Sequence, residues 1–330
     1  MTFDLPLIFT VLMGVAILAY VILDGYDLGV GMLLPFATRD EQDRMVASIG
    51  PFWDANETWL VLGVGLLLVA FPAAHGLILG ALYLPVALML IALMLRGVAF
   101  EFRVKAEGWH RELWNRIFFF GSFLATLSQG VMVGALVTGF RGDGVYWIFN
   151  SFVALGLTGG YALLGAAWLI MKTEGALQAK ALRLARLALF IVAAGIAAVS
   201  IATPLVSQTV FAKWFDYPRT LGLLVLPLVT LAAGWEVWRS VGRLQQDTST
   251  GEWRPFAAAA TIFLCAFLGL AYSLFPWIVI DRMTIWQAAS HPSALKVILA
   301  GAVVVLPFII AYTAFAYRVF WGKAKELSYG

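Results

Sequence analysis

The sequence predicts an all-α polytopic membrane protein with nine transmembrane helices, and three observations point to this class. Of 330 residues, 62% are hydrophobic and only 12% are charged, whereas soluble domains are about half apolar and about a quarter charged. The mean hydropathy is +0.89. The apolar residues also gather in runs long enough to cross a bilayer as helices.

The nine runs follow one another with short polar connections. Their limits are residues 6–36, 54–72, 76–98, 117–140, 145–171, 184–206, 220–238, 256–276 and 294–320. Small residues at four-residue spacing lie inside several runs and predict close approach between helices. Examples are Gly25 with Gly29, Gly130 with Gly134, and Gly156 with Gly160.

Orientation follows from the basic residues. The connections after the first, third, fifth and seventh runs, with the C-terminal segment around Lys323 and Lys325, hold most of the 22 Lys and Arg residues. Because basic loops stay in the cytoplasm, the N-terminus is expected outside, in the periplasm, and the C-terminus inside. The basic residues form small groups between runs, so the pI near 9.0 does not predict a nucleic-acid partner.

Four acids mark the first two runs at their cytoplasmic ends. Asp24 and Asp27 lie three residues apart in the first run, and Asp54 and Glu57 repeat that spacing at the start of the second. An i, i+3 pair shares one helix face, and consecutive helices are usually neighbours, so the four carboxyl groups are expected to converge. Intramembrane carboxylates typically mark an ion or proton route, and clustered acids suit proton transfer.

A structural interpretation competes with this one. In it the acids are solvated helix ends or partners of Arg39 and Arg44, and Asp54 caps the second helix. It is favoured for Asp27 and Glu57. Proton transfer is favoured for Asp24, which has a full turn of apolar residues before it and glycine-rich backbone after it.

A second charged group closes the third run in the segment LMLRGVAFEFRVK. Arg96, Glu101 and Arg103 either position the acids of the first two helices, meet a partner subunit, or serve as ordinary cytoplasmic anchors.

Histidine and cysteine are scarce. His75 falls in the short outer loop between the second and third runs, His110 in an inner loop, and His291 at the outer entry to the last run, so none lies mid-membrane. Cys265 is the single cysteine. A haem held between helices usually needs mid-membrane His, or His and Met. No haem, copper or other metal centre owned by this chain is therefore expected.

Several stretches together resemble subunit II of the bd-type quinol oxidases, which are bacterial terminal oxidases. They are DGYDLGVGMLLPF, PFWDANETWL, RGVAFEFR, GSF at 121–123, and the late FPW and MTIW pair. The resemblance covers essentially the whole chain, although Gln287 stands where the family often has an acid after Trp286.

The resemblance implies a fold of two four-helix bundles and one extra helix. We accordingly divide the single membrane domain of residues 1–330 into a first bundle (1–140), a second bundle (141–276), and an outer turn with the last helix (277–330). It also implies a heterodimer in the bacterial cytoplasmic (inner) membrane. There, subunit I carries haems b, and d in some complexes, and the complex oxidises quinol and reduces dioxygen to water. Subunit II has no haem of its own. Some members bind a structural quinone or a small single-helix subunit, and membrane lipid surrounds the complex.

The resemblance further implies roles for individual residues. Asp24 and Asp54 correspond to a path for cytoplasmic protons, with Asp27, Glu57 and Glu101 as weaker candidates. In a separate role, Trp53, Arg96 and Arg103 are expected to support the structure or the subunit interface.

Two other functions compete. A proton- or cation-coupled secondary transporter also uses intramembrane acids, but it predicts interrupted helices, carboxylates near the bilayer midplane and a sequence repeat. A purely structural scaffold for a catalytic partner predicts that the acids only cap helices and pair with arginine.

Overall fold

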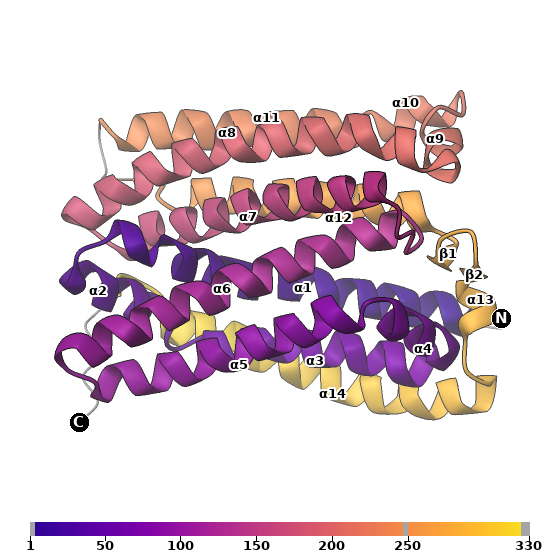
Figure 1. Ribbon diagram of the computed structural model, residues 1–330, viewed down its shortest axis with the longest axis horizontal. Helices are drawn as coiled ribbons and strands as arrows, with labels where there is room; N and C mark the ends of the chain where they lie inside the picture. The colour runs from indigo at the N-terminus through magenta and orange to yellow at the C-terminus, as the bar shows by residue number, and fades with distance from the viewer. Residues whose placement is uncertain (1–3, 247–249, 325–330) are drawn as a thin grey trace.

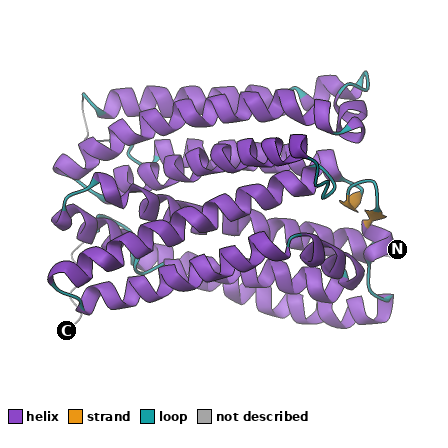
Figure 2. Ribbon diagram, viewed as in Figure 1, coloured by secondary structure: helices purple, strands orange, loops and turns teal. Residues whose placement is uncertain are grey.

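The structure is a computed structural model that describes residues 4–246 and 250–324, and nearly all of this length is helical (Figure 2). The long helices run side by side along one direction (Figure 1). They are α1 (Leu5–Leu33), α3 (Trp53–Ala70), α5 (Tyr83–Lys105), α6 (Gly108–Val137), α7 (Gly144–Lys172), α8 (Gly175–Val206), α11 (Val225–Leu244), α12 (Arg254–Leu274) and α14 (Pro292–Val319).

Short elements lie at the two ends of this bundle (Figure 1). One end, where α1 begins, carries α4 (Pro72–Ala81), α9 (Gln208–Trp214), α10 (Arg219–Leu223), the two-stranded antiparallel sheet of β1 (Trp277–Val279) and β2 (Met283–Thr284), and α13 (Ile285–Ala288). The other end carries the 3-10 helix η1 (Leu34–Phe36) and α2 (Arg39–Ile49). We call these the α13 end and the α2 end.

The helices have the length and composition of membrane spans. Within the described residues, 8 helices are long and apolar enough to cross a bilayer, and the count reaches 9 if α2 and α3, which meet at 51°, form one bent span. The chain is therefore an all-α polytopic membrane protein. The count of nine crossings and their orientation remain predictions.

Several helices differ from the apolar runs. The segment at 39–49, interpreted as a charged loop, is α2, because the Thr38 backbone N–H donates to Glu41 Oε2 over 2.7 Å in a capping box. The run at 76–98 is divided between α4 and α5, with Leu82 at the break. Pro85 explains this break, because proline has no N–H to bond the carbonyl of Ala81 and its ring would clash with that carbonyl.

Glycines bring α1 against α7. A Cβ added at Gly29 would lie 1.9 Å from the Tyr161 carbonyl oxygen, and one at Gly165 would lie 2.4 Å from the Gly29 carbonyl carbon. Only hydrogen fits between these backbones, as the small-residue spacing predicts. The same contact makes residues 24–33 the most continuously buried part of α1. Two of the predicted site acids lie in this part.

Candidate functional site

One arginine joins two of the predicted acids. Arg96 Nη1, from the middle of α5, donates to Asp24 Oδ1 of α1 and to Glu57 Oε1 of α3, over 2.8 Å in each case. The side chains of Arg96 and Asp24 are both 0% exposed, whereas that of Glu57 is 27% exposed. The cluster therefore runs from a dry centre to a carboxylate with access to the surface.

Packing fixes the arginine in this position. A Cβ added at Gly121 of α6 would lie 2.8 Å from the Ala92 carbonyl oxygen and 3.2 Å from Arg96 Cβ, so this glycine lets α6 approach α5 there. The rings of Trp53 and Phe118 each lie 5.9 Å from the guanidinium carbon, within reach of a cation–π contact. The Trp53 ring thus lies against the Arg96 guanidinium.

The cluster keeps unused hydrogen-bonding capacity. Asp24 Oδ2 and the Nε and Nη2 atoms of Arg96 are buried, and none has a hydrogen-bond partner among the described residues. Buried polar atoms are nearly always paired with protein or with water. The three atoms are therefore exceptions to the pairing that the rest of the cluster shows.

Asp27 belongs to a second network, one helical turn along α1. Its Oδ2 accepts from Asn56 Nδ2 over 2.7 Å, and Asn56 Nδ2 also lies 2.9 Å from Tyr26 Oη. Tyr317 of α14 donates to Asn56 Oδ1 over 3.2 Å and lies 2.7 Å from Tyr26 Oη. The last helix is therefore tied to the acid-bearing helices through Asn56.

A third group of polar side chains lies on the other side of Asp24. Gln129 Nε2 donates to Tyr20 Oη over 2.8 Å, and Tyr161 Oη donates to Gln129 Oε1 over 2.7 Å. Tyr20 is one turn before Asp24 in α1. Sequence reasoning missed Gln129 and Asn56, although polar side chains inside apolar runs are a signal for buried networks.

The structure does not bring Asp54 and Glu101 into the cluster. Both are exposed, Asp54 in the first turn of α3 and Glu101 near the end of α5. Asp54 lies three residues before Glu57 and so shares its helix face. The capping alternative for Asp54 is wrong, because the residue before α3 is Phe52 and no side chain caps that helix. Asp54 is thus an exposed acid that lies about one helical turn before the partly exposed Glu57.

The structural alternative named the wrong partners. Arg39 and Arg44 are exposed on α2, while Asp24 and Glu57 pair with Arg96. An arginine buried among carboxylates is also more than a cytoplasmic anchor.

Arg103 holds the α2 end together. Its Nε donates to Asn115 Oδ1 of α6 and its Nη2 to Asp43 Oδ1 of α2, each over 2.8 Å. Arg111 contacts the same Asp43 oxygen at 2.6 Å. Arg103 therefore joins α5, α6 and α2 but does not touch the acid cluster.

The described residues do not fit a haem held between helices. His75 lies in α4, His110 in the first turn of α6, and His291 is the residue before α14, all at helix ends. Within residues 4–246 and 250–324, no group of three or more His, Cys, Asp or Glu residues is placed to hold a metal ion.

Comparisons of the sequence and of the fold with known proteins point to the same family. The family model described as cytochrome bd terminal oxidase subunit II matches residues 5–320. The chain is 29% identical to cytochrome bd ubiquinol oxidase subunit 2 of Bacillus subtilis over an alignment of 330 positions that covers 94% of each protein. It is also 29% identical to cytochrome bd-I ubiquinol oxidase subunit 2 of Escherichia coli K12, over 98% of this chain and 96% of that protein. Its fold matches a chain of the bd oxidase from Geobacillus thermodenitrificans with a TM-score of 0.73 at 15% identity, covering 97% of this chain and 100% of the other.

Proposed function

This chain belongs to the cytochrome bd terminal oxidase subunit II family, and from that premise we propose that it is the accessory subunit of a respiratory bd-type quinol oxidase. The complex oxidises quinol and reduces dioxygen to water, and its subunit I bears the haems. The chain is a multi-pass protein of the bacterial inner membrane. Membership of this family argues against the transporter alternative.

We propose that the α2 end faces the cytoplasm and that the acid cluster takes part in proton uptake there. The distribution of basic residues supports this orientation. The proposed order is Asp54 at the surface, then Glu57, then the buried pair of Arg96 and Asp24, with Asp27 beside it. Glu101 lies outside this order, so we assign it at most an effect through the local charge.

The observation that carries the proposal is the sharing of one guanidinium by two carboxylates of unequal exposure. When both acids are ionised, the three groups together carry one negative charge, and one bound proton makes them neutral. A proton can thus enter at Glu57 and reside at Asp24 without an isolated charge in the interior. The buried unpartnered atoms of Asp24 and Arg96 supply sites for the water that proton transfer needs.

Further parts of the proposal concern structure and partners. Trp53 supports the acid cluster, and Arg103 supports the α2 end. Residues 1–140 and 141–276 form the two helix bundles, and residues 277–330 form the outer turn and the last helix. Subunit I contains haems b, and haem d in complexes that use it. A small single-helix subunit and a structural quinone complete the proposed assembly, and we assign neither to residues of this chain.

In the test, this chain is co-expressed with subunit I, and the complex is purified through a tag on this chain. We expect Asp24→Asn and Asp54→Asn to leave the haem content unchanged and to slow quinol-driven oxygen uptake several-fold, since each removes a group that can carry a proton. The solvent isotope effect in D₂O should rise in both variants. Glu107→Gln, an exposed acid at the same end, is the matched control. Unchanged turnover in both variants would overturn the proton path and leave the structural scaffold.

A further inference from the structure

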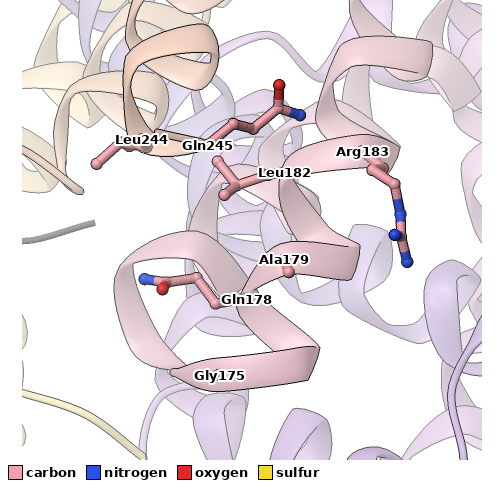
Figure 3. A pocket seen from close by; sticks show the side chains of 7 residues that line it. All are labelled: Gly175, Gln178, Ala179, Leu182, Arg183, Leu244 and Gln245. Carbon is pink, nitrogen blue, oxygen red and sulfur yellow. The ribbon is translucent and has the colours of Figure 1, made fainter. Parts of the chain in front are cut away.

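A cavity lies at the α2 end, on a different pair of helices from the acid cluster. It measures about 310 Å³ and opens between the first turns of α8 and the last turn of α11. Figure 3 shows its lining, with Arg183 extending to one side of the other side chains. The lining residues are Gly175, Gln178, Ala179, Leu182, Arg183, Leu244 and Gln245.

The two helices that form the cavity present apolar side chains outward along their length. Leu187 and Phe190 of α8 are 59% and 58% exposed, and Leu231 and Trp235 of α11 are 70% and 66% exposed. Both helices are candidate membrane spans, and they form one edge of the bundle (Figure 1). Acyl chains of lipid therefore have an apolar surface that leads from the membrane interior to the cavity.

Positive charge gathers where that surface ends. Arg183 and Arg186 lie one turn apart on α8, and Arg239 and Arg243 lie one turn apart on α11. Helix α8 contains no acid, and the acid of α11, Glu236, lies 3.6 Å from Arg254 of α12. Of these four arginines, Arg183 lines the cavity itself. An acid also lies near the lining, because Glu252 accepts from Gln178 over 2.5 Å, but Lys323 pairs with that carboxylate at 2.6 Å.

One of these arginines is held in place and retains a donor. The Arg186 guanidinium carbon lies 4.7 Å from the centroid of the Trp238 ring. A Cβ added at Gly242 would be 3.4 Å from Arg186 Nη2, so the glycine makes room for the guanidinium on α11. Arg186 Nε is buried and has no acceptor among the described residues. Arg186 does not line the cavity, so its fixed guanidinium, one turn beyond Arg183, adds positive charge beside the cavity and does not reach into it.

We propose that this cavity binds the phosphate headgroup of an anionic phospholipid of the cytoplasmic leaflet, with its acyl chains along α8 and α11. Basic pockets between transmembrane helices on the cytoplasmic side have this chemistry. The depth of the cavity in the membrane matches that of a lipid headgroup, because the cavity lies where the apolar stretches of α8 and α11 give way to their polar ends. The proposal rests on the cytoplasmic orientation of the α2 end and does not depend on the proton path.

The experiment measures phosphatidylglycerol retained by the purified oxidase complex. The complex is reconstituted in phosphatidylcholine nanodiscs with a minor fraction of phosphatidylglycerol, extracted into mild detergent and analysed by native mass spectrometry. Each arginine near the surface is worth about fivefold in affinity for an anionic lipid, so Arg183→Gln with Arg186→Gln should weaken retention by roughly 30-fold.

Arg183→Gln alone should weaken retention by about fivefold. This single variant guards against misfolding, because Arg183 is exposed and, within the described part of the chain, has no ring contact of the kind that Arg186 makes. The control is Arg116→Gln, an arginine of the same end that is 69% exposed and paired only within α6. Equal retention by wild type and both cavity variants, or equal loss in the control, would overturn the proposal. Displacement of the lipid by millimolar inorganic phosphate would also overturn it, in favour of a free phosphate site.

Discussion

Replacing Arg96 by glutamine removes the cation between two buried or partly buried carboxylates. Glutamine keeps an N–H donor, but its amide nitrogen lies at the level of Arg96 Nε, short of the Nη1 atom that contacts both acids, and it carries no charge. Asp24, with its side chain 0% exposed, would then share the interior with Glu57 without compensation. The protein must either keep an uncompensated charge in a dry site or hold an additional proton.

The structure sets the size of the effect. Removing one partner of a fully buried ion pair costs about 3–5 kcal/mol in the free energy of unfolding. Because Glu57 is 27% exposed, water reduces the cost on its side, and we expect the lower end of that range, about 3 kcal/mol. Neutralising both acids as well, by Asp24→Asn and Glu57→Gln in the Arg96→Gln background, should recover about 2 kcal/mol of this loss, as expected for directly coupled residues.

Unfolding of the purified complex in mixed micelles with rising SDS, followed through the haem absorbance of subunit I, gives these differences. The control is Arg116→Gln, whose exposed i, i+4 pair with Glu112 should contribute less than about 1 kcal/mol. If Arg96→Gln is no more destabilising than this control, Arg96 does not compensate the buried acids. The same conclusion follows if neutralising the two acids makes the Arg96→Gln complex less stable still.

Two other predictions concern packing and the α14 connection. Gly29→Ala should prevent assembly or strongly lower the unfolding midpoint, because the added methyl would meet the Tyr161 carbonyl oxygen at 1.9 Å. Gly80→Ala is its control and should be neutral, because an added Cβ there has nothing within 4 Å. The yield of haem-containing complex measures the effect of each variant. Tyr317→Phe removes the hydroxyl that contacts Asn56 and Tyr26 and should cost about 1 kcal/mol in the same SDS titration, with Tyr312→Phe, 63% exposed on the same helix, as its control.

The acid cluster was partly predictable. The i, i+3 spacing of the acids and the succession of two helices were sufficient to expect Asp24 and Glu57 close together. Helical periodicity and chain order are local properties, and the sequence displays both. The same reasoning placed Asp54 correctly in the first turn of this helix, since α3 begins at Trp53. It did not predict that Asp54 is exposed while Glu57 is partly buried.

The role of Arg96 was not predictable with the same means. Arg96 is far from Asp24 in the sequence, and the direction of its side chain depends on its contacts with α1, α3 and α6 together. Spacing alone therefore left three alternatives open for it. Tyr317 is a stronger example, since it joins the network of Asp27 from the last helix of the chain. No local pattern contains that contact.

The balance of charge in the interior supports the proposed proton path over the scaffold alternative. An ion pair that only supports a fold needs one cation for each acid, and even then apolar residues of similar volume are often as stable. Here Asp24, Asp27 and Glu57 are gathered around Arg96 as the nearby cation, and two carboxylate oxygens, Asp24 Oδ2 and Asp27 Oδ1, are buried without partners among the described residues. An excess of acid with unused oxygens costs stability in a dry interior. That cost is understandable if the oxygens hold and release protons, and a scaffold gives no reason for it.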